Sequence, residues 1–238
     1  MKKFKNIIAN IKDIIIRMIL PYLSEKTKFK FIYRYKFWKY CQNAEYSASG
    51  AGSDINATIK IRSGLESFFR KFNIKSIVDI PCGDFHWFGK INLENYKYIG
   101  CDLVEEVINN NNLKFNNNKN ISFTTFDLIN DDIKRFDNCD FLIIRDCLVH
   151  LDNKDVHKVL KKIFLSKIKY IGLTSYDIKN NDIKPQKGDR WRPINFLLKP
   201  YSLNTPFYIM DDSNSFNNTE NLKKLLIWKN ESSNIYPK

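Results

Sequence analysis

Several residue types that define special architectures are scarce in this sequence of 238 residues. Eight Gly and seven Pro exclude a collagen-like or low-complexity chain. Five Cys, an odd number without a C-x-x-C pair, exclude a disulfide scaffold and predict a reducing, cytoplasmic location. Cys147 and His150 could share a helical face, but no second pair of metal ligands accompanies them, so we expect no metal site.

Long apolar runs are also missing. Apolar residues recur at helical spacing from Phe4 to Ile19, but Lys12, Asp13 and Arg17 interrupt them, and Pro21 ends the pattern. The run is therefore shorter than the ~20 apolar residues of a membrane-spanning helix, and no signal-peptide cleavage site follows it. Two interpretations are open: a helix docked on the protein or on a second copy in a homodimer, or an amphipathic helix at the inner membrane face.

The positive charge is concentrated at the N-terminus. Residues 1–40 carry eleven Lys and Arg against two acidic residues, so nine of the thirteen net positive charges lie there. A nucleic-acid binder usually spreads its charge over a reading surface, so we do not expect a nucleic acid as partner. Aromatic and basic residues alternate over residues 28–40. This pattern is typical of a surface that stacks the bases of a single-stranded nucleic acid or, in the preferred interpretation, of an amphipathic element whose rings face the core. We divide the chain into a basic amphipathic arm, 1–44, and a main domain, 45–238.

The main domain alternates predicted helices and strands. With 43% hydrophobic residues the chain can build a sizeable core. Ser53 or Asp54 can cap one helix, Asp152 can cap another, and the Asn-rich stretch 109–120 reads as a loop without chemistry. Predicted strands cover 76–80, 97–101, 121–126, 140–144, 170–174, 207–210 and 225–228. The order predicts an α/β fold: a Rossmann-like, seven-stranded, mostly parallel sheet with helices on both faces.

Three Asp residues follow three successive predicted strands. Asp79 opens the segment 79–84, in which Gly83 gives the backbone freedom to turn and lets a ligand approach. Asp102 lies 23 residues later, the usual spacing for a carboxylate that binds ribose hydroxyls, and Asp127 closes the third strand. Each Asp alone is more simply explained as a turn or helix cap. Three Asp residues at the ends of three successive strands together predict a pocket for an adenosine-containing ligand.

The turn after the first strand does not fit a dinucleotide. The fingerprint of such a site is G-x-G-x-x-G, and here only Gly83 matches it, with Pro81 at the first glycine position and His86 at the third. Two of the three glycines of a pyrophosphate-binding turn are therefore missing, which disfavours NAD.

Four segments of the chain carry a family resemblance. SIVDIPCGDFHW, YIGCDL, the strand-end Phe126-Asp127 and DFLIIRDCLVHL resemble class I methyltransferases that use S-adenosylmethionine. The pattern D-x-P-C-G-D-F-x-W is similar to that of a bacterial subset associated with capsule and O-antigen biosynthesis. The stretches 49–53 and 58–62 upstream, and 192–196 and 200–206 downstream, match that subset as well. The resemblance spans roughly residues 45–210.

The resemblance implies S-adenosylmethionine as cofactor, with S-adenosylhomocysteine as product, and assigns roles by motif. Gly83 would lie under the methionine part, Asp102 would bind the ribose hydroxyls, and Asp127 would accept from the adenine amino group. Phe85 and Trp87 would offer their ring faces to the sulfonium. The implied cofactor-binding residues are Asp79, Pro81, Cys82, Gly83, Asp84, Phe85, Trp87, Asp102, Leu103, Asp127, Leu128, Arg145 and Arg62.

The catalytic candidates follow the fourth strand. A hydroxyl acceptor benefits from a nearby general base, and His150 is the best placed histidine. Asp146, four residues earlier, would lie on the same helical face and orient the imidazole. The alternative is that His150 only packs at the start of a helix.

Acceptor recognition is predicted for the stretch 188–192 together with Tyr176. The guanidinium of Arg192 suits a phosphate or carboxylate, and the ring of Trp191 suits a sugar. The alternative is a surface loop with a buried Trp.

The leading interpretation is a methyltransferase that acts on the oxygen of a small-molecule or glycan precursor. The acceptor would be a sugar, or a phosphorylated or phosphoramidate compound, in capsular or surface polysaccharide biosynthesis. An RNA methyltransferase that uses the basic arm is the alternative enzyme, and a non-catalytic binding module on the same fold is the third hypothesis.

Overall fold

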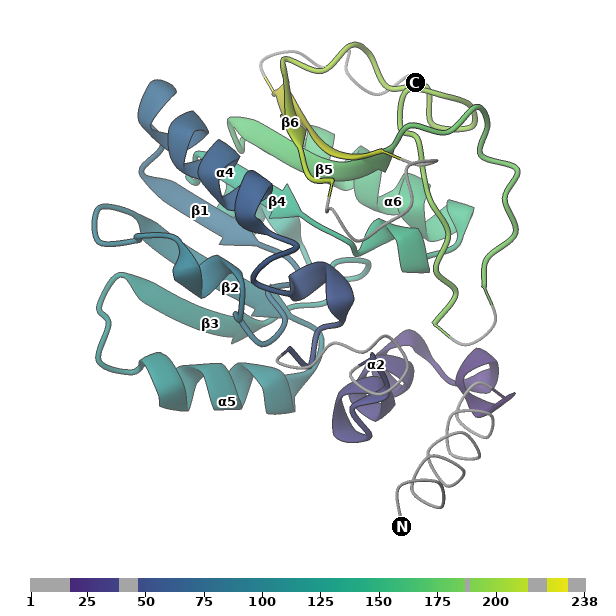
Figure 1. The fold of residues 1–238 in the computed structure, drawn as a ribbon, viewed down its shortest axis with the longest axis horizontal. Coiled ribbons are helices and arrows are strands. Elements are labelled where there is room, and N and C mark those ends of the chain that lie inside the picture. The colour runs from purple at the N-terminus through teal and green to yellow at the C-terminus, as the bar shows by residue number, and fades with distance from the viewer. Residues whose placement is uncertain (1–17, 39–46, 187–188, 214–221, 231–238) are drawn as a thin grey trace.

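The computed structural model describes residues 18–38, 47–186, 189–213 and 222–230, which form a single sheet with helices around it (Figure 1). The predicted N-terminal amphipathic helix lies almost entirely outside these residues. In the part of the chain that is described, no helix is long and apolar enough to cross a membrane.

One seven-stranded sheet organises the molecule, in the order β3-β2-β1-β4-β5-β7-β6. The first five strands are parallel, and β7 runs antiparallel to both β5 and β6. The strands are β1 Ser76–Asp79, β2 Lys97–Asp102, β3 Ile121–Thr125, β4 Phe141–Ile144, β5 Tyr170–Tyr176, β6 Tyr208–Asp211 and β7 Lys223–Lys229. The predicted α/β fold with seven strands is therefore confirmed.

Helices cover both faces of the sheet because its central strands are apolar on both sides. Successive residues of β1 show the alternation: Ile77 belongs to the cluster under α4 (Ile59–Lys71) and α5 (Glu105–Phe115), and Val78 to the cluster under α6 (Asn153–Phe164). α6 begins as predicted, because the Asp152 side chain accepts a hydrogen bond from the main-chain N–H of Asp155 at 2.9 Å. The shorter helices are η1 Leu20–Tyr22, η2 Ala51–Ser53, η3 Phe88–Lys90, η4 Ile133–Phe136 and η5 Leu148–His150.

The prediction of a loop over residues 109–120 is wrong for its first half, which is the end of α5. The helix forms because Val107 and Ile108 are buried against the sheet, and the polar residues after them hide this apolar face in the sequence. Asn111, itself 1% exposed, points inward and donates from its side-chain nitrogen to the main-chain oxygen of Gly83 at 2.8 Å. The helix predicted from residue 53 or 54 also starts later, at Ile59.

The helix α2 (Glu25–Arg34) lies apart from the two helical layers, near the carboxyl ends of the parallel strands (Figure 1). It begins at Ser24, whose hydroxyl accepts from the N–H of Thr27. Ile32 is fully buried together with Leu20 and Phe37, so this segment has a small core of its own. Residues 39–40 lie outside the described residues, and over the rest the amphipathic interpretation holds in part: Phe37 and Trp38 are buried, but so is Lys28, and Tyr35 is 49% exposed.

Candidate active site

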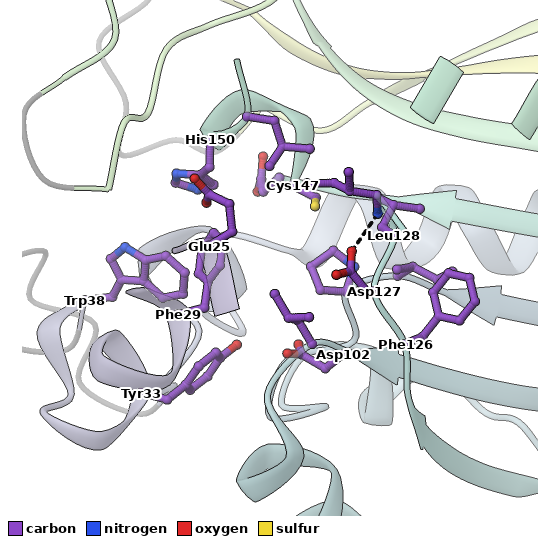
Figure 2. A pocket seen from close by; sticks show the side chains of 16 residues that line it. Glu25, Phe29, Tyr33, Trp38, Asp102, Phe126, Asp127, Leu128, Cys147 and His150 are labelled. Atoms are coloured by element: carbon purple, nitrogen blue, oxygen red, sulfur yellow. Dashed lines mark hydrogen bonds between the residues drawn. The ribbon is translucent and has the colours of Figure 1, made fainter. Parts of the chain in front are cut away.

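The carboxyl ends of β1, β2, β3 and β4 meet at an apolar cavity. Figure 2 shows Phe29 and Tyr33 of α2 facing the strand ends that carry Asp102 and Asp127. Pro81 also belongs to this wall. The remaining lining residues are Glu25, Trp38, Ile80, Leu103, Phe126, Leu128, Ile129, Asp146, Cys147, His150 and Leu151.

Asp102 is the buried carboxylate of this cavity, with 3% of its surface exposed. Its two oxygens accept from the main-chain N–H groups of Gly83 at 3.1 Å and Val104 at 2.9 Å. Burial raises its pKa to about 6, although these hydrogen bonds favour the charged form. The carboxylate therefore holds the β1 and β2 loops together at the cavity wall, with Leu103 beside it.

Asp127 and Leu128 line the same cavity. The Asp127 carboxylate accepts from the main-chain N–H groups of Ile129 at 2.9 Å and Asn130 at 3.1 Å, as Figure 2 shows for the first. The buried Leu128 adds an apolar contact surface. A carboxylate has further lone pairs, so Asp127 can still accept from a ligand.

The loop after β1 comes very close to the segment around Ser49. Gly83 has φ +55°, and a side chain there would place its Cβ only 2.3 Å from the Ser49 hydroxyl oxygen. The Asp84 carboxylate accepts from the hydroxyls of Ser47 and Ser49 and from the N–H of Ala48. Asp84 lines neither this cavity nor the second cavity described below. Its carboxylate instead connects the loop after β1 to the segment around Ser49.

Asp79 and Cys82 form the floor beneath this loop. Asp79 is 1% exposed and accepts from the Tyr98 hydroxyl at 2.7 Å. Burial raises the pKa of Asp79 to about 7 and that of the Cys82 thiol well above its usual range. The floor is thus a protonated thiol next to a carboxyl that titrates near neutral pH.

A second cavity of about 410 Å³ adjoins the first. Both are lined by Tyr33, Trp38, Pro81, Asp146 and His150, so they meet beside the end of β4. The second cavity is also lined by Ser49, Ala51, Gly52, Ser53, Asp79, Cys82, Gly83, Trp87, Arg145, Tyr176, Gln186, Trp191 and Lys223.

Ion pairs occupy the polar side of the second cavity. Arg145 donates two hydrogen bonds of 2.9 Å to Asp212, and its guanidinium lies 4.7 Å from the ring centroid of Trp87. Lys223 contacts Asp146, and Tyr176 donates to the same carboxylate at 3.4 Å. Burial raises the pKa of Asp146, but the charges of Lys223 and Arg145 outweigh it and lower the pKa to about 2.

Besides Asp84, two further predicted cofactor residues lie away from both cavities. Phe85 is 2% exposed, and its ring packs against Tyr98, Phe115 and Phe123 within the core, 4.8 to 5.1 Å between centroids. Arg62 donates to the main-chain oxygen of Ile55 at 3.0 Å and lines neither cavity. Trp87 keeps a place on the wall of the second cavity.

The predicted orientation of His150 by Asp146 differs from the structure. Residues 148–150 form a 3₁₀ turn rather than α-helix, and the Asp146 carboxylate is bound to Lys223. His150 Nδ1 instead lies 2.8 Å from the main-chain oxygen of Asp189. This carbonyl can only accept, so Nδ1 carries the proton and Nε2 is left to accept one.

The three predicted acceptor residues separate into two groups. Trp191 and Tyr176 line the second cavity, with their rings edge to face at 5.7 Å. Arg192 departs from the prediction: its side chain is buried and donates to the main-chain oxygen of Leu151 and, at 2.8 Å, to the Asn153 side chain. Its guanidinium is used inside the protein, because the loop turns it toward η5 and the start of α6.

Five residues that sequence analysis missed complete the arrangement. Glu25, Phe29 and Tyr33 come from α2, and Lys223 and Asp212 come from the β6–β7 region. The chain gave no local signal for them, because each reaches the site from an element distant in sequence. Among the described residues, no cluster of His, Cys, Asp and Glu could hold a metal ion.

Comparisons with known proteins identify the fold. No protein-family model matches the sequence, and no curated protein matches it. The crystal structure of magnesium protoporphyrin IX methyltransferase from Synechocystis PCC 6803 superposes with a TM-score of 0.56 at 12% identity, over 86% of this chain and 96% of that one. The methyltransferase domain of the bacterial protein CtHen1 superposes with a TM-score of 0.52 at 13% identity, over 73% of this chain and 100% of that one. The chain therefore has the Rossmann-like fold of the class I S-adenosylmethionine-dependent methyltransferases.

Proposed function

We propose that this protein is an S-adenosylmethionine-dependent methyltransferase. The observation that carries the proposal is the pair of cavities that meet beside His150, one apolar with a buried carboxylate and one polar. The first suits an adenosine, and the second suits a methionine tail together with an acceptor. In parallel α/β sheets, ligands bind beyond the carboxyl ends of the strands, where both cavities lie.

The residues present fit the cofactor. Asp102 would accept from the ribose hydroxyls, Asp127 from the adenine amino group, and Leu103 and Leu128 would contact the adenine. Gly83 lies in the lining of the second cavity, and glycine is required there because even a Cβ would collide with Ser49. When bound, S-adenosylmethionine supplies a methyl group whose bond to sulfur breaks as the acceptor oxygen attacks, leaving the electron pair on sulfur.

His150 acts as the general base in this proposal. Its Nδ1 proton is held by the main-chain oxygen of Asp189 at 2.8 Å, so Nε2 takes the proton from the acceptor hydroxyl. Trp38 keeps Asp189 in place, because its ring nitrogen donates to the Asp189 carboxylate at 3.0 Å. Tyr176 and Lys223 fix the carboxylate of Asp146 beside the acceptor. Positioning of the two reactants supplies a large share of the rate in such displacements.

The acceptor in this proposal is a sugar, or a phosphorylated or phosphoramidate precursor, of capsular or surface polysaccharide. The sequence pattern around residues 79–87 and the rings of Trp191 and Tyr176 support it. We also propose a cytoplasmic protein whose arm, residues 1–44, contacts the inner membrane face or a second copy. The arm also contributes to the site, because α2 within it lines the first cavity.

Calorimetry with S-adenosylmethionine, S-adenosylhomocysteine and NAD tests the proposal. We expect one site with micromolar affinity for the first two compounds and no heat from NAD. Asp102→Ala should weaken binding by at least roughly 100-fold, since a hydrogen bond to a charged group contributes about 1.5–3 kcal/mol and two ribose hydroxyls lose theirs. Glu94→Ala, which removes an exposed carboxylate, is the matched control and should leave the affinity unchanged. A folded wild-type protein that binds neither compound would refute the proposal.

A further inference from the structure

The charges of the second cavity cancel each other. Each of the two cations in its described lining is paired with carboxylates: Arg145 with Asp212 at 2.9 Å, and Lys223 with Asp146 and, at 3.2 Å, with Asp212. Asp79 adds a further carboxyl group to the lining. The cavity therefore offers an incoming ligand no net positive charge.

The two arginines that flank Trp191 in the sequence are also engaged. Arg192 is 5% exposed and bound to Leu151 and Asn153, and Arg190 has its guanidinium 3.9 Å from Glu25. A phosphate on the acceptor would meet carboxylates here, and its desolvation would not be offset by an unpaired cation of the described lining.

Aromatic rings also line the second cavity. Trp191 is half-buried, and Tyr176 meets it edge to face at 5.7 Å and 90°. Trp87 and Trp38 add further rings to the same lining. Rigid rings with a few fixed polar groups suit a ligand that has an apolar face and hydroxyls at its edge.

Asp146 is built into the cavity at the cost of an unfavourable backbone conformation. Its φ is +54°, in the left-handed region that Asp tolerates only at a cost, and its N–H donates to the Thr174 hydroxyl at 3.0 Å. Gly52 makes room for it, because a Cβ at residue 52 would lie 2.8 Å from the Asp146 carboxylate oxygen. Such strain points to a role for this carboxylate beyond pairing with Lys223.

We propose that the second cavity binds an uncharged pyranose ring of a glycan precursor. The C–H face of the ring would lie on Trp191, and two neighbouring hydroxyls would bind Asp146 and Lys223. This inference rests on the proposed function, and it selects the sugar among the acceptors named there. Phosphate groups of such a precursor would stay outside the cavity.

Saturation-transfer NMR on the full-length protein with bound S-adenosylhomocysteine tests the inference. The probes are the methyl α-pyranosides of glucose, galactose and mannose, each compared with the 6-phosphate of the same sugar. We expect saturation of ring protons of at least one neutral glycoside, with its phosphate binding more weakly by roughly tenfold or more. Trp191→Ala should remove the signal, and Tyr22→Ala, which truncates a ring that is 89% exposed, should not.

A charge change at Asp146 gives the sharpest outcome. Asp146→Asn keeps the shape of the side chain but leaves the charge of Lys223 only partly compensated, so the preference should shift toward the 6-phosphates by roughly tenfold. Tighter binding of the phosphates by the wild-type protein, or no saturation of any neutral glycoside, would overturn the inference. The proposed function would fail separately, through loss of S-adenosylhomocysteine binding to the wild-type protein.

Discussion

Replacing Arg192 by Ala should destabilise the fold and leave the cofactor affinity unchanged. The guanidinium is buried, and it donates to the Leu151 main-chain oxygen, to the Asn153 side chain at 2.8 Å and to the Tyr201 hydroxyl at 3.4 Å. These bonds join the loop after residue 189 to η5 and to the start of α6. The side chain is therefore structural, although its sequence position suggested an anion-binding role.

The magnitude follows from the acceptors left behind. A buried acceptor that loses its partner costs about 1–3 kcal/mol, and Leu151 keeps no other partner for its main-chain oxygen among the bonds described here. Asn153 keeps the hydrogen bond from the Tyr201 hydroxyl at 2.8 Å, so its loss is smaller. With the packing of the removed side chain, we expect a loss of about 3 kcal/mol in the free energy of unfolding, or roughly 10 °C in Tm for a domain of this size.

Urea denaturation of Arg192→Ala and Arg192→Lys measures this loss. Lys should recover only part of the stability, because one ammonium cannot reproduce the three directed bonds of the guanidinium. Arg70→Ala, at an exposed position of α4, is the control and should stay within about 0.5 kcal/mol of the wild type. If Arg192→Ala keeps the wild-type stability but loses binding of a phosphorylated acceptor, the guanidinium faces the cavity and our reasoning is wrong.

Three further predictions concern the floor and wall of the site. Asp79, with its pKa raised by burial to about 7, keeps its proton in the folded protein while the unfolded chain loses it near pH 4. The free energy of unfolding of the wild type relative to Asp79→Asn should therefore fall by up to about 1.4 kcal/mol per pH unit between these values, and a flat difference would contradict the assignment. Asn111→Ala frees the Gly83 main chain and should weaken S-adenosylhomocysteine binding by roughly tenfold in calorimetry, whereas unchanged affinity would remove Asn111 from the site. Gly52→Ala should displace the Asp146 carboxylate and abolish glycoside saturation while cofactor binding persists; retained saturation would show that this contact does not matter.

The sheet and the ligand-binding edge could be predicted from the sequence because they depend on local patterns. Clusters of apolar residues mark most of the strands, and the parallel direction of the first strands brings Asp79, Asp102 and Asp127 to the same edge of the sheet. Asp102 and Asp127 consequently lie where the spacing placed them. α5 was missed over Asn109–Phe115, because a helix that buries few residues shows little periodicity.

Side-chain direction in the loops could not be predicted in the same way. Phe85 and Arg192 lie in motifs that suggest contact with a ligand, yet the backbone turns both side chains into the protein. The partner of His150 is a main-chain oxygen 39 residues away, and no side-chain pattern encodes such a bond. Long-range packing decides these positions, as it does for Lys223 at the start of β7.

Hydrogen–deuterium exchange with and without S-adenosylhomocysteine tests most directly whether the cofactor binds at the carboxyl ends of the parallel strands, because it reports both that a ligand binds and which segments it protects. Our account predicts protection of the loops after β1, β2 and β3, over residues 79–84, 102–104 and 126–130, together with α2. Protection confined to other segments, or none in a folded protein at saturating ligand, would contradict it.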